Sequence, residues 1–133
     1  MTLQWTEDLA IGHAVIDNQH KELMDKFNGF LEAIHRRQDH EQLVNLFCFL
    51  DRYVEHHFRE EELLMEQSGY TEFPAHRAEH QVFTRRLQGL RSELERTGPT
   101  IAVLIRTNKA LLYWLTTHIK QVDVALGKYL AEL

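Results

Sequence analysis

The chain has only one cysteine among its 133 residues, Cys48, and this excludes an intrachain disulfide. A chain without disulfides fits a reducing compartment, so we expect a cytoplasmic protein. Cys48 itself falls within a helical pattern of apolar residues, and from that pattern we expect its thiol to be buried and inert.

Long apolar runs are also missing. The longest strongly apolar run, residues 110–115, is far too short to span a bilayer, and residues 1–12 lack the basic and apolar regions of a signal peptide. The 15 basic and 20 acidic residues give a formal net charge of −5, and the basic ones form no block. We therefore expect neither membrane insertion nor nucleic-acid binding.

What the chain does contain is apolar residues at helical spacing over most of its length, with no sustained strand alternation. Asp17 is suited to the N-cap of a first helix, Ser68 and Gly69 to the end of a second, and Pro74 to the start of a third. These signals predict four helices, at about residues 17–35, 40–67, 74–97 and 100–130.

Four long helices with short connections predict an all-α fold, an antiparallel up-down four-helix bundle. Residues 1–16 carry apolar side chains without a helical period, so we expect them to pack on the bundle as an ordered arm. The length fits one domain, residues 1–133, with the arm at 1–16 and the bundle at 17–133.

Seven polar side chains occupy positions where these helices should be apolar. In the third helix the apolar series ends in His80 and His76, and in the second helix it includes His57 and Glu61. Burying an imidazole or a carboxylate is costly unless another group pairs with it, and two metal ions would satisfy all seven groups at once. The candidate ligands are His20, His57, Glu61, His76, His80, His118 and Asp123.

The spacing of these residues favours a dinuclear site. The pairs in the second and third helices are each four residues apart, so each pair lies on one helix face. His118 and Asp123 are five apart and would point about 140° apart on an ideal α-helix, so we expect Asp123 to reach in from the edge as a bridging carboxylate. Imidazole-rich ligation with few carboxylates suits iron, copper or zinc better than magnesium or calcium.

Four segments contain these residues: IDNQH at 16–20, HFREE at 57–61, HRAEH at 76–80 and HIKQVD at 118–123. Together they resemble one known family, the hemerythrins, and the long gap between His80 and His118 resembles its bacterial single-domain branch. Each motif alone is weak, but together they give a counterpart for every ligand of that family's metal site, and the resemblance covers nearly the whole chain.

This resemblance implies a non-haem di-iron centre with an oxo or hydroxo bridge. By this resemblance, one iron would be held by His76, His80 and His118, and the other by His20 and His57. Glu61 and Asp123 would bridge the two irons. The second iron would then have an open position at which O2 binds reversibly.

The same resemblance implies an apolar pocket around the bound O2. Phe58, Trp114, Leu115 and Ile119 match the pocket residues, and their spacing from His57 and His118 is compatible with that position. An apolar wall excludes the water and protons that would leave oxidised iron behind. We expect an oxygen-binding protein rather than an enzyme, a monomer that stores or transports O2 or delivers it to an O2-consuming enzyme.

Other metal-binding classes fit the sequence less well. A ferritin-like oxidase needs two Glu-x-x-His motifs, and the chain has one match, at Glu32 and His35. Residues 76–80 fit the H-x-x-E-H pattern of some zinc peptidases, with Glu79 as general base. That interpretation leaves the other candidate ligands unexplained, as does a purely structural bundle.

Two further alternatives keep the di-iron site and change its role. An O2 or redox sensor usually needs an output domain, and we expect this sequence to form a single domain without one. An oxidase or peroxidase would need a proton-delivering group near the open iron, and the sequence offers no candidate beyond the ligands themselves.

Overall fold

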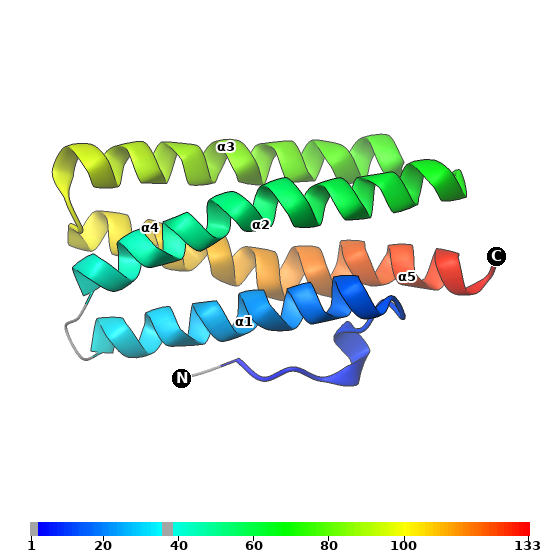
Figure 1. Cartoon of the computed structure of the whole chain (residues 1–133), viewed down its shortest axis with the longest axis horizontal. Helices are drawn as coiled ribbons and strands as arrows, with labels where there is room; N and C mark the ends of the chain where they lie inside the picture. Colours follow the sequence, from blue (N-terminus) through cyan, green and yellow to red (C-terminus); the bar gives the residue numbers. More distant parts are fainter. Residues whose placement is uncertain (1–2, 36–38) are drawn as a thin grey trace.

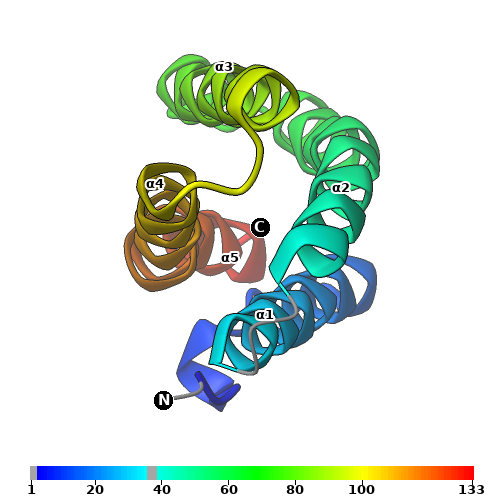
Figure 2. The same cartoon turned by 90° about the vertical axis from the view of Figure 1, so that its left-hand side faces the viewer.

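The chain folds as the predicted all-α bundle, in which successive long helices run in opposite directions (Figure 1). The computed structural model describes residues 3–35 and 39–133, and those residues contain no strand. The helical segments are η1 (Glu7–Leu9), α1 (Ala14–His35), α2 (Asp39–Ser68), α3 (Phe73–Thr97), α4 (Ile101–Tyr113), the π-helix η2 (Trp114–Asp123) and α5 (Val124–Ala131). Seen end-on, α1 to α4 follow one another around the bundle (Figure 2). No helix in the described part of the chain is long and apolar enough to cross a membrane.

Local signals explain where the helices end. Gly69 (φ 68°) follows the last residue of α2 in the left-handed region that glycine adopts without strain. Gly98 (φ 79°) does the same after α3, where its N–H donates to the carbonyl of Leu94. The hydroxyl of Thr100 accepts a hydrogen bond from the N–H of Val103 and caps α4. The predicted starts and stops around the second, third and fourth helices are therefore confirmed to within about two residues.

The first helix begins earlier than predicted. The sequence favours Asp17 as its N-cap, but α1 starts at Ala14, and the Asp17 carboxylate instead accepts hydrogen bonds from the N–H groups of Ile11 and Gly12. The side chain that was expected to begin the helix fixes the turn before it. Because that turn occupies residues 11–13, the helix gains one turn at its N-terminus.

The N-terminal residues pack on the bundle as an ordered arm. The N–H of Leu3 donates to the side chain of Asn28 on α1, and the Asn28 amide donates back to the Leu3 carbonyl. Further along, the backbone of Ile11 lies so close to Gly127 on α5 that a Cβ there would be 2.6 Å from the Ile11 Cα. Glycine at position 127 is what allows this approach.

The core is apolar at the end of the bundle where α1 passes to α2 and α3 to α4. Buried leucine, phenylalanine and valine side chains fill it, among them Leu43, Phe47, Leu50, Leu87, Leu90, Leu94, Val103 and Leu111. The prediction of a buried thiol is wrong, because Cys48 is exposed. It follows Phe47 by one residue, which on an α-helix is a rotation of about 100° away from the buried face.

Candidate metal centre

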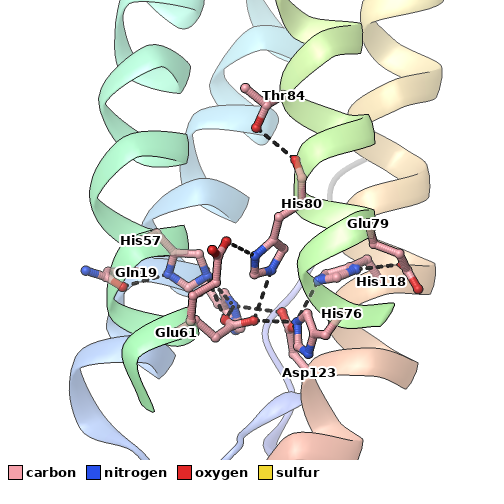
Figure 3. A network of polar contacts seen from close by, with 11 residues as sticks. Gln19, His57, Glu61, His76, Glu79, His80, Thr84, His118 and Asp123 are labelled. Atoms are coloured by element: carbon pink, nitrogen blue, oxygen red, sulfur yellow. Dashed lines mark hydrogen bonds and ion pairs between the residues drawn. The ribbon is translucent and has the colours of Figure 1, made fainter. Parts of the chain in front are cut away.

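All seven candidate ligands meet at one level inside the bundle, near the end where α2 passes to α3 (Figure 3). His20 comes from α1, the pair at 57 and 61 from α2, the pair at 76 and 80 from α3, and the pair at 118 and 123 from η2. Every one of them is at most 2% exposed. Four histidine-bearing helices therefore contribute to a single cluster of buried polar atoms.

The π-helix explains how His118 and Asp123 face the same cluster. The prediction that Asp123 reaches in from the edge of an α-helix is wrong, because residues 114–123 form i→i+5 hydrogen bonds instead of i→i+4. Residues five apart then share a face, and the His118 Nε2 lies 2.9 Å from the Asp123 Oδ1. The wider turn of the π-helix therefore lets both His118 and Asp123 face the cluster, although they are five residues apart.

Three histidines gather on one side of the two carboxylates. The Nε2 of His76 lies 2.7 Å from the Glu61 Oε1 and 2.8 Å from the Asp123 Oδ1. The Nε2 of His80 lies 3.2 Å from the Glu61 Oε1, and the Nε2 of His118 lies 2.9 Å from the Asp123 Oδ1. Each carboxylate thus presents one oxygen to this three-histidine group.

The remaining two histidines gather on the other side. The Nε2 of His57 lies 3.0 Å from the Glu61 Oε2, and the Nε2 of His20 lies 3.1 Å from the Asp123 Oδ2. The two Nε2 atoms are 3.1 Å apart. Each carboxylate therefore has its second oxygen in this two-histidine group, which is the arrangement that a carboxylate adopts when it bridges two cations.

The donor atoms fit metal ions better than they fit one another. Both oxygens of Glu61 and of Asp123, and the Nε2 atoms of the three-histidine group, have no hydrogen-bond partner of acceptable geometry among the described residues, although neighbouring donors lie only 2.7–3.2 Å away. Ligand atoms on adjacent corners around a first-row metal ion are separated by about 3 Å, because each lies about 2.1 Å from the ion. The spacing of these oxygen and nitrogen atoms therefore suits binding to a shared metal ion better than hydrogen bonding between them.

Hydrogen bonds on the outer nitrogens orient three of the imidazoles. The Nδ1–H of His57 donates to the amide oxygen of Gln19 (2.6 Å), that of His80 to Glu62 (2.8 Å), and that of His118 to Glu79 (2.9 Å) (Figure 3). A proton on Nδ1 leaves the Nε2 lone pair free to face the cluster. Glu62 is therefore more than a neighbour of Glu61 in sequence, because it orients a histidine of the next helix.

In the metal-free protein, protons neutralise the buried carboxylates. Burial works against the charge of His20 and His76, but the close Asp123 and Glu61 carboxylates outweigh it and raise their pKa values to about 9 and about 10. Burial likewise opposes the charge of Glu61, yet the surrounding histidines hold its pKa well below the usual range. The cluster is thus a site for positive charge, whether protons or metal ions supply it.

Comparison with known proteins agrees with this donor set. Residues 12–130 match the hemerythrin family as defined by the hemerythrin HHE cation binding domain. This chain belongs to the hemerythrin family. A non-haem di-iron centre is the cofactor of that family, and the cluster described above could hold it.

Several characterised hemerythrins are similar to the chain over most of its length. A bacteriohemerythrin of Stenotrophomonas maltophilia is 35% identical over 126 residues, which cover 92% of this chain and 78% of that protein. A bacteriohemerythrin of Methylococcus capsulatus is 32% identical and covers 97% of both chains. A myohemerythrin of Sipunculus nudus is 29% identical over 90% of this chain and 86% of its own.

The geometry also weakens the competing metal-binding classes. The zinc-peptidase interpretation makes Glu79 a general base, but Glu79 contacts the outer nitrogen of His118 and lies behind the ligands rather than among them. The ferritin-like interpretation relies on Glu32, which is exposed, and on His35, whose side chain lies outside the described residues. Neither Glu79 nor Glu32, the glutamates that these two interpretations require, is among the residues that form the cluster.

The four predicted pocket residues are all buried at this level. Phe58 stacks on the ring of His80 with centroids 3.9 Å apart, and Trp114 stacks on His118 at 3.6 Å. Leu115 and Ile119 are at most 2% exposed within the π-helix. Two of the four residues therefore pack directly on candidate ligands, and the other two are buried in the same π-helix as His118.

Sequence reasoning missed the side chains that hold the ligands in place. Gln19, Glu62 and Glu79 each lie next to a candidate ligand in sequence, yet each one contacts a histidine from a different helix. The helical stripes alone could not pair them across helices. Tyr53 was also missed, although it lies four residues before His57 and so on the same helix face, a signal that was available.

Proposed function

We propose that this chain binds O2 reversibly at its non-haem di-iron centre and serves to store, transport or deliver O2. The proposed ligands are His76, His80 and His118 for one iron, His20 and His57 for the other, and Glu61 and Asp123 as bridges. Hemerythrin-family relatives bind oxygen, and the coarser assignment of an iron-containing, oxygen-binding domain follows from family membership.

One observation supports the proposal most directly. Each of the two carboxylates presents one oxygen to the three-histidine group and the other oxygen to the two-histidine group. The two groups therefore offer unequal numbers of protein donors, and the two-histidine group leaves more of its metal's coordination sphere for an external ligand. A protein that carries one small molecule per site needs such a metal ion, with a coordination position that no side chain occupies.

The chain's own residues would control what reaches that open position. When bound, the iron pair supplies the electrons that O2 takes up on binding and gives back on release. Phe58 and Trp114 stack on ligand rings and shield them from water, while Leu115 and Ile119 complete the apolar layer. Exclusion of water from this layer keeps O2 binding reversible, because water supplies the protons that drive oxidation of the metal.

The visible spectrum of the reduced, iron-loaded protein tests this function. We expect a new absorption band on adding air that disappears when O2 is removed under argon, over several cycles. Spectral change that persists under argon would instead indicate an oxidase or a sensor that responds by oxidation. Absence of any change, with two irons per chain demonstrated, would rule out O2 binding altogether.

A matched pair of variants tests the ligand assignment. We expect His57→Ala to lose most of the second iron, since it removes one of only two imidazoles there, and to abolish the reversible band. His56→Ala changes the same residue type one position away, where the side chain is exposed, and should keep both irons. Equal iron content in the two variants would contradict the assignment of His57.

A further inference from the structure

Two buried polar atoms belong to rings that stack on proposed metal ligands, the hydroxyl of Tyr53 on His57 and the indole N–H of Trp114 on His118. We propose that the Tyr53 hydroxyl, beside the indole N–H of Trp114, donates a hydrogen bond to the small ligand held next to His57. The ligand class is a short molecule with exposed lone pairs, such as O2 or azide. For O2 as the ligand, this inference rests on the proposed function. For azide as the ligand, it requires only the metal site.

The Tyr53 ring is held in place against His57, a proposed metal ligand. Its ring stacks on the His57 ring with centroids 4.6 Å apart and an angle of 14° between the planes. On its other contacts it stacks on Phe49 at 5.9 Å and meets Phe58 edge-on at 6.0 Å. The side chain is only 5% exposed, so this aromatic packing determines where the hydroxyl lies.

The Tyr53 ring lies directly on a proposed metal ligand. That ligand, His57, has its Nε2 3.0 Å from the Glu61 Oε2 and 3.1 Å from the His20 Nε2. A phenol ordinarily keeps its proton at neutral pH, so the hydroxyl is available as a hydrogen-bond donor.

Neither polar atom has a hydrogen-bond partner among the residues that the structure describes. No donor or acceptor of acceptable geometry meets the Tyr53 Oη or the Trp114 Nε1 there. Leaving a buried hydroxyl unpaired is costly, and such groups are normally satisfied by protein, water or a ligand.

A second, half-buried tyrosine shows what a purely structural hydroxyl looks like here. Tyr129 on α5 also packs against an aromatic ring, that of Tyr70, but its hydroxyl donates to the carbonyl of Ser68 at 2.7 Å. Tyr53 differs in that its hydroxyl is unpaired among the described residues and its ring lies on a proposed metal ligand. That difference indicates a partner that arrives with the metal site.

The test compares Tyr53→Phe with Tyr129→Phe in the iron-loaded, oxidised protein, with sodium azide as the probe. Losing one hydrogen bond should weaken azide binding by roughly three- to tenfold in Tyr53→Phe. The shift of the azide stretching frequency between H2O and D2O should also disappear in that variant. Tyr129→Phe should keep the wild-type azide affinity and isotope shift. Unchanged azide affinity and isotope shift in Tyr53→Phe would overturn the proposal.

Two further measurements separate this proposal from its neighbours. In the metal-free protein, Tyr53→Phe should melt at or above the wild-type temperature, because it removes an unpaired buried hydroxyl; a lower melting temperature would mean that the hydroxyl has an internal partner and would overturn the inference. If wild type binds azide but no O2, the proposed carrier function fails, while the azide comparison still decides the role of Tyr53.

Discussion

The two ends of the bundle bury different kinds of side chain along the same helices. Where α1 passes to α2, the interior consists of residues such as Leu43, Phe47 and Leu90. Where α2 passes to α3, the same stripes carry imidazoles and carboxylates that are just as buried. Burial of apolar surface stabilises the first end without further help, whereas the second end depends on what its polar atoms bind.

This contrast shows how the fold tolerates a polar interior. Without metal, the cluster is held together by protons that the carboxylates retain on His20 and His76 far above the usual pH range for histidine. With metal, the same lone pairs would bind the ions directly. The helices are positioned by the apolar end, by the covering layer of aromatic rings and by the outer hydrogen bonds of residues such as Glu62.

The largest expected effect is that of removing the metal. A ligand that binds only the folded state at a thousand times its dissociation constant adds about 4 kcal/mol, so the metal-free protein should melt about 10 °C or more below the loaded protein. Hydrogen exchange should rise mainly around the cluster and leave the apolar end protected. Equal melting temperatures after proven metal removal, or a uniform rise in exchange, would contradict the proposed difference between the ends.

A bridging carboxylate can be removed without changing the volume of the site. Glu61→Gln should lower the iron content below two per chain and lose most of the metal-dependent stability, because one group serves both ions. Iron analysis and thermal melting measure this. Glu60→Gln, one residue away on the exposed face of α2, is the control and should resemble wild type. Two tightly bound irons in Glu61→Gln would contradict its bridging role.

The same contrast explains what the sequence could and could not predict. Apolar spacing was enough to predict the four helices, and histidines interrupting that spacing were enough to predict which side chains meet. The geometry of His118 and Asp123 was not predictable, because a π-helix depends on tertiary demands that outweigh the ordinary α-helical hydrogen bonds. Pairings such as Gln19 with His57 join different helices, so no local pattern encodes them.

A smaller effect tests how the arm closes the metal end. Gly127→Ala would place a Cβ 2.6 Å from the Ile11 Cα, and overpacking of this kind costs about 1–3 kcal/mol. Gly89→Ala on α3 is the control, because a Cβ at that position meets no described atom within 4 Å. That substitution should stabilise the helix by about 0.5–1 kcal/mol. Denaturant unfolding of both variants would show opposite signs, and equal signs would contradict the close approach.

The smallest expected effect is a dependence of the metal's contribution on pH. In the metal-free protein the pKa values of His20 and His76 rise from an ordinary value of 6.5 to about 9 and about 10, although burial alone would lower them. Groups with raised pKa values stabilise the folded state fully below pH 6.5, and this stabilisation is lost as the pH rises through 9 and 10. Burial lowers the pKa of His57, so its effect on stability is confined to about pH 6.5 and below and leaves the trend at higher pH unchanged. Metal binding displaces these protons, so the loaded protein should not show the loss.

The melting-temperature gap between loaded and metal-free protein should therefore widen by a few degrees from pH 6.5 to 9, with protons released on metal addition at pH 8. A constant gap without proton release would mean that His20 and His76 are already unprotonated before the metal arrives.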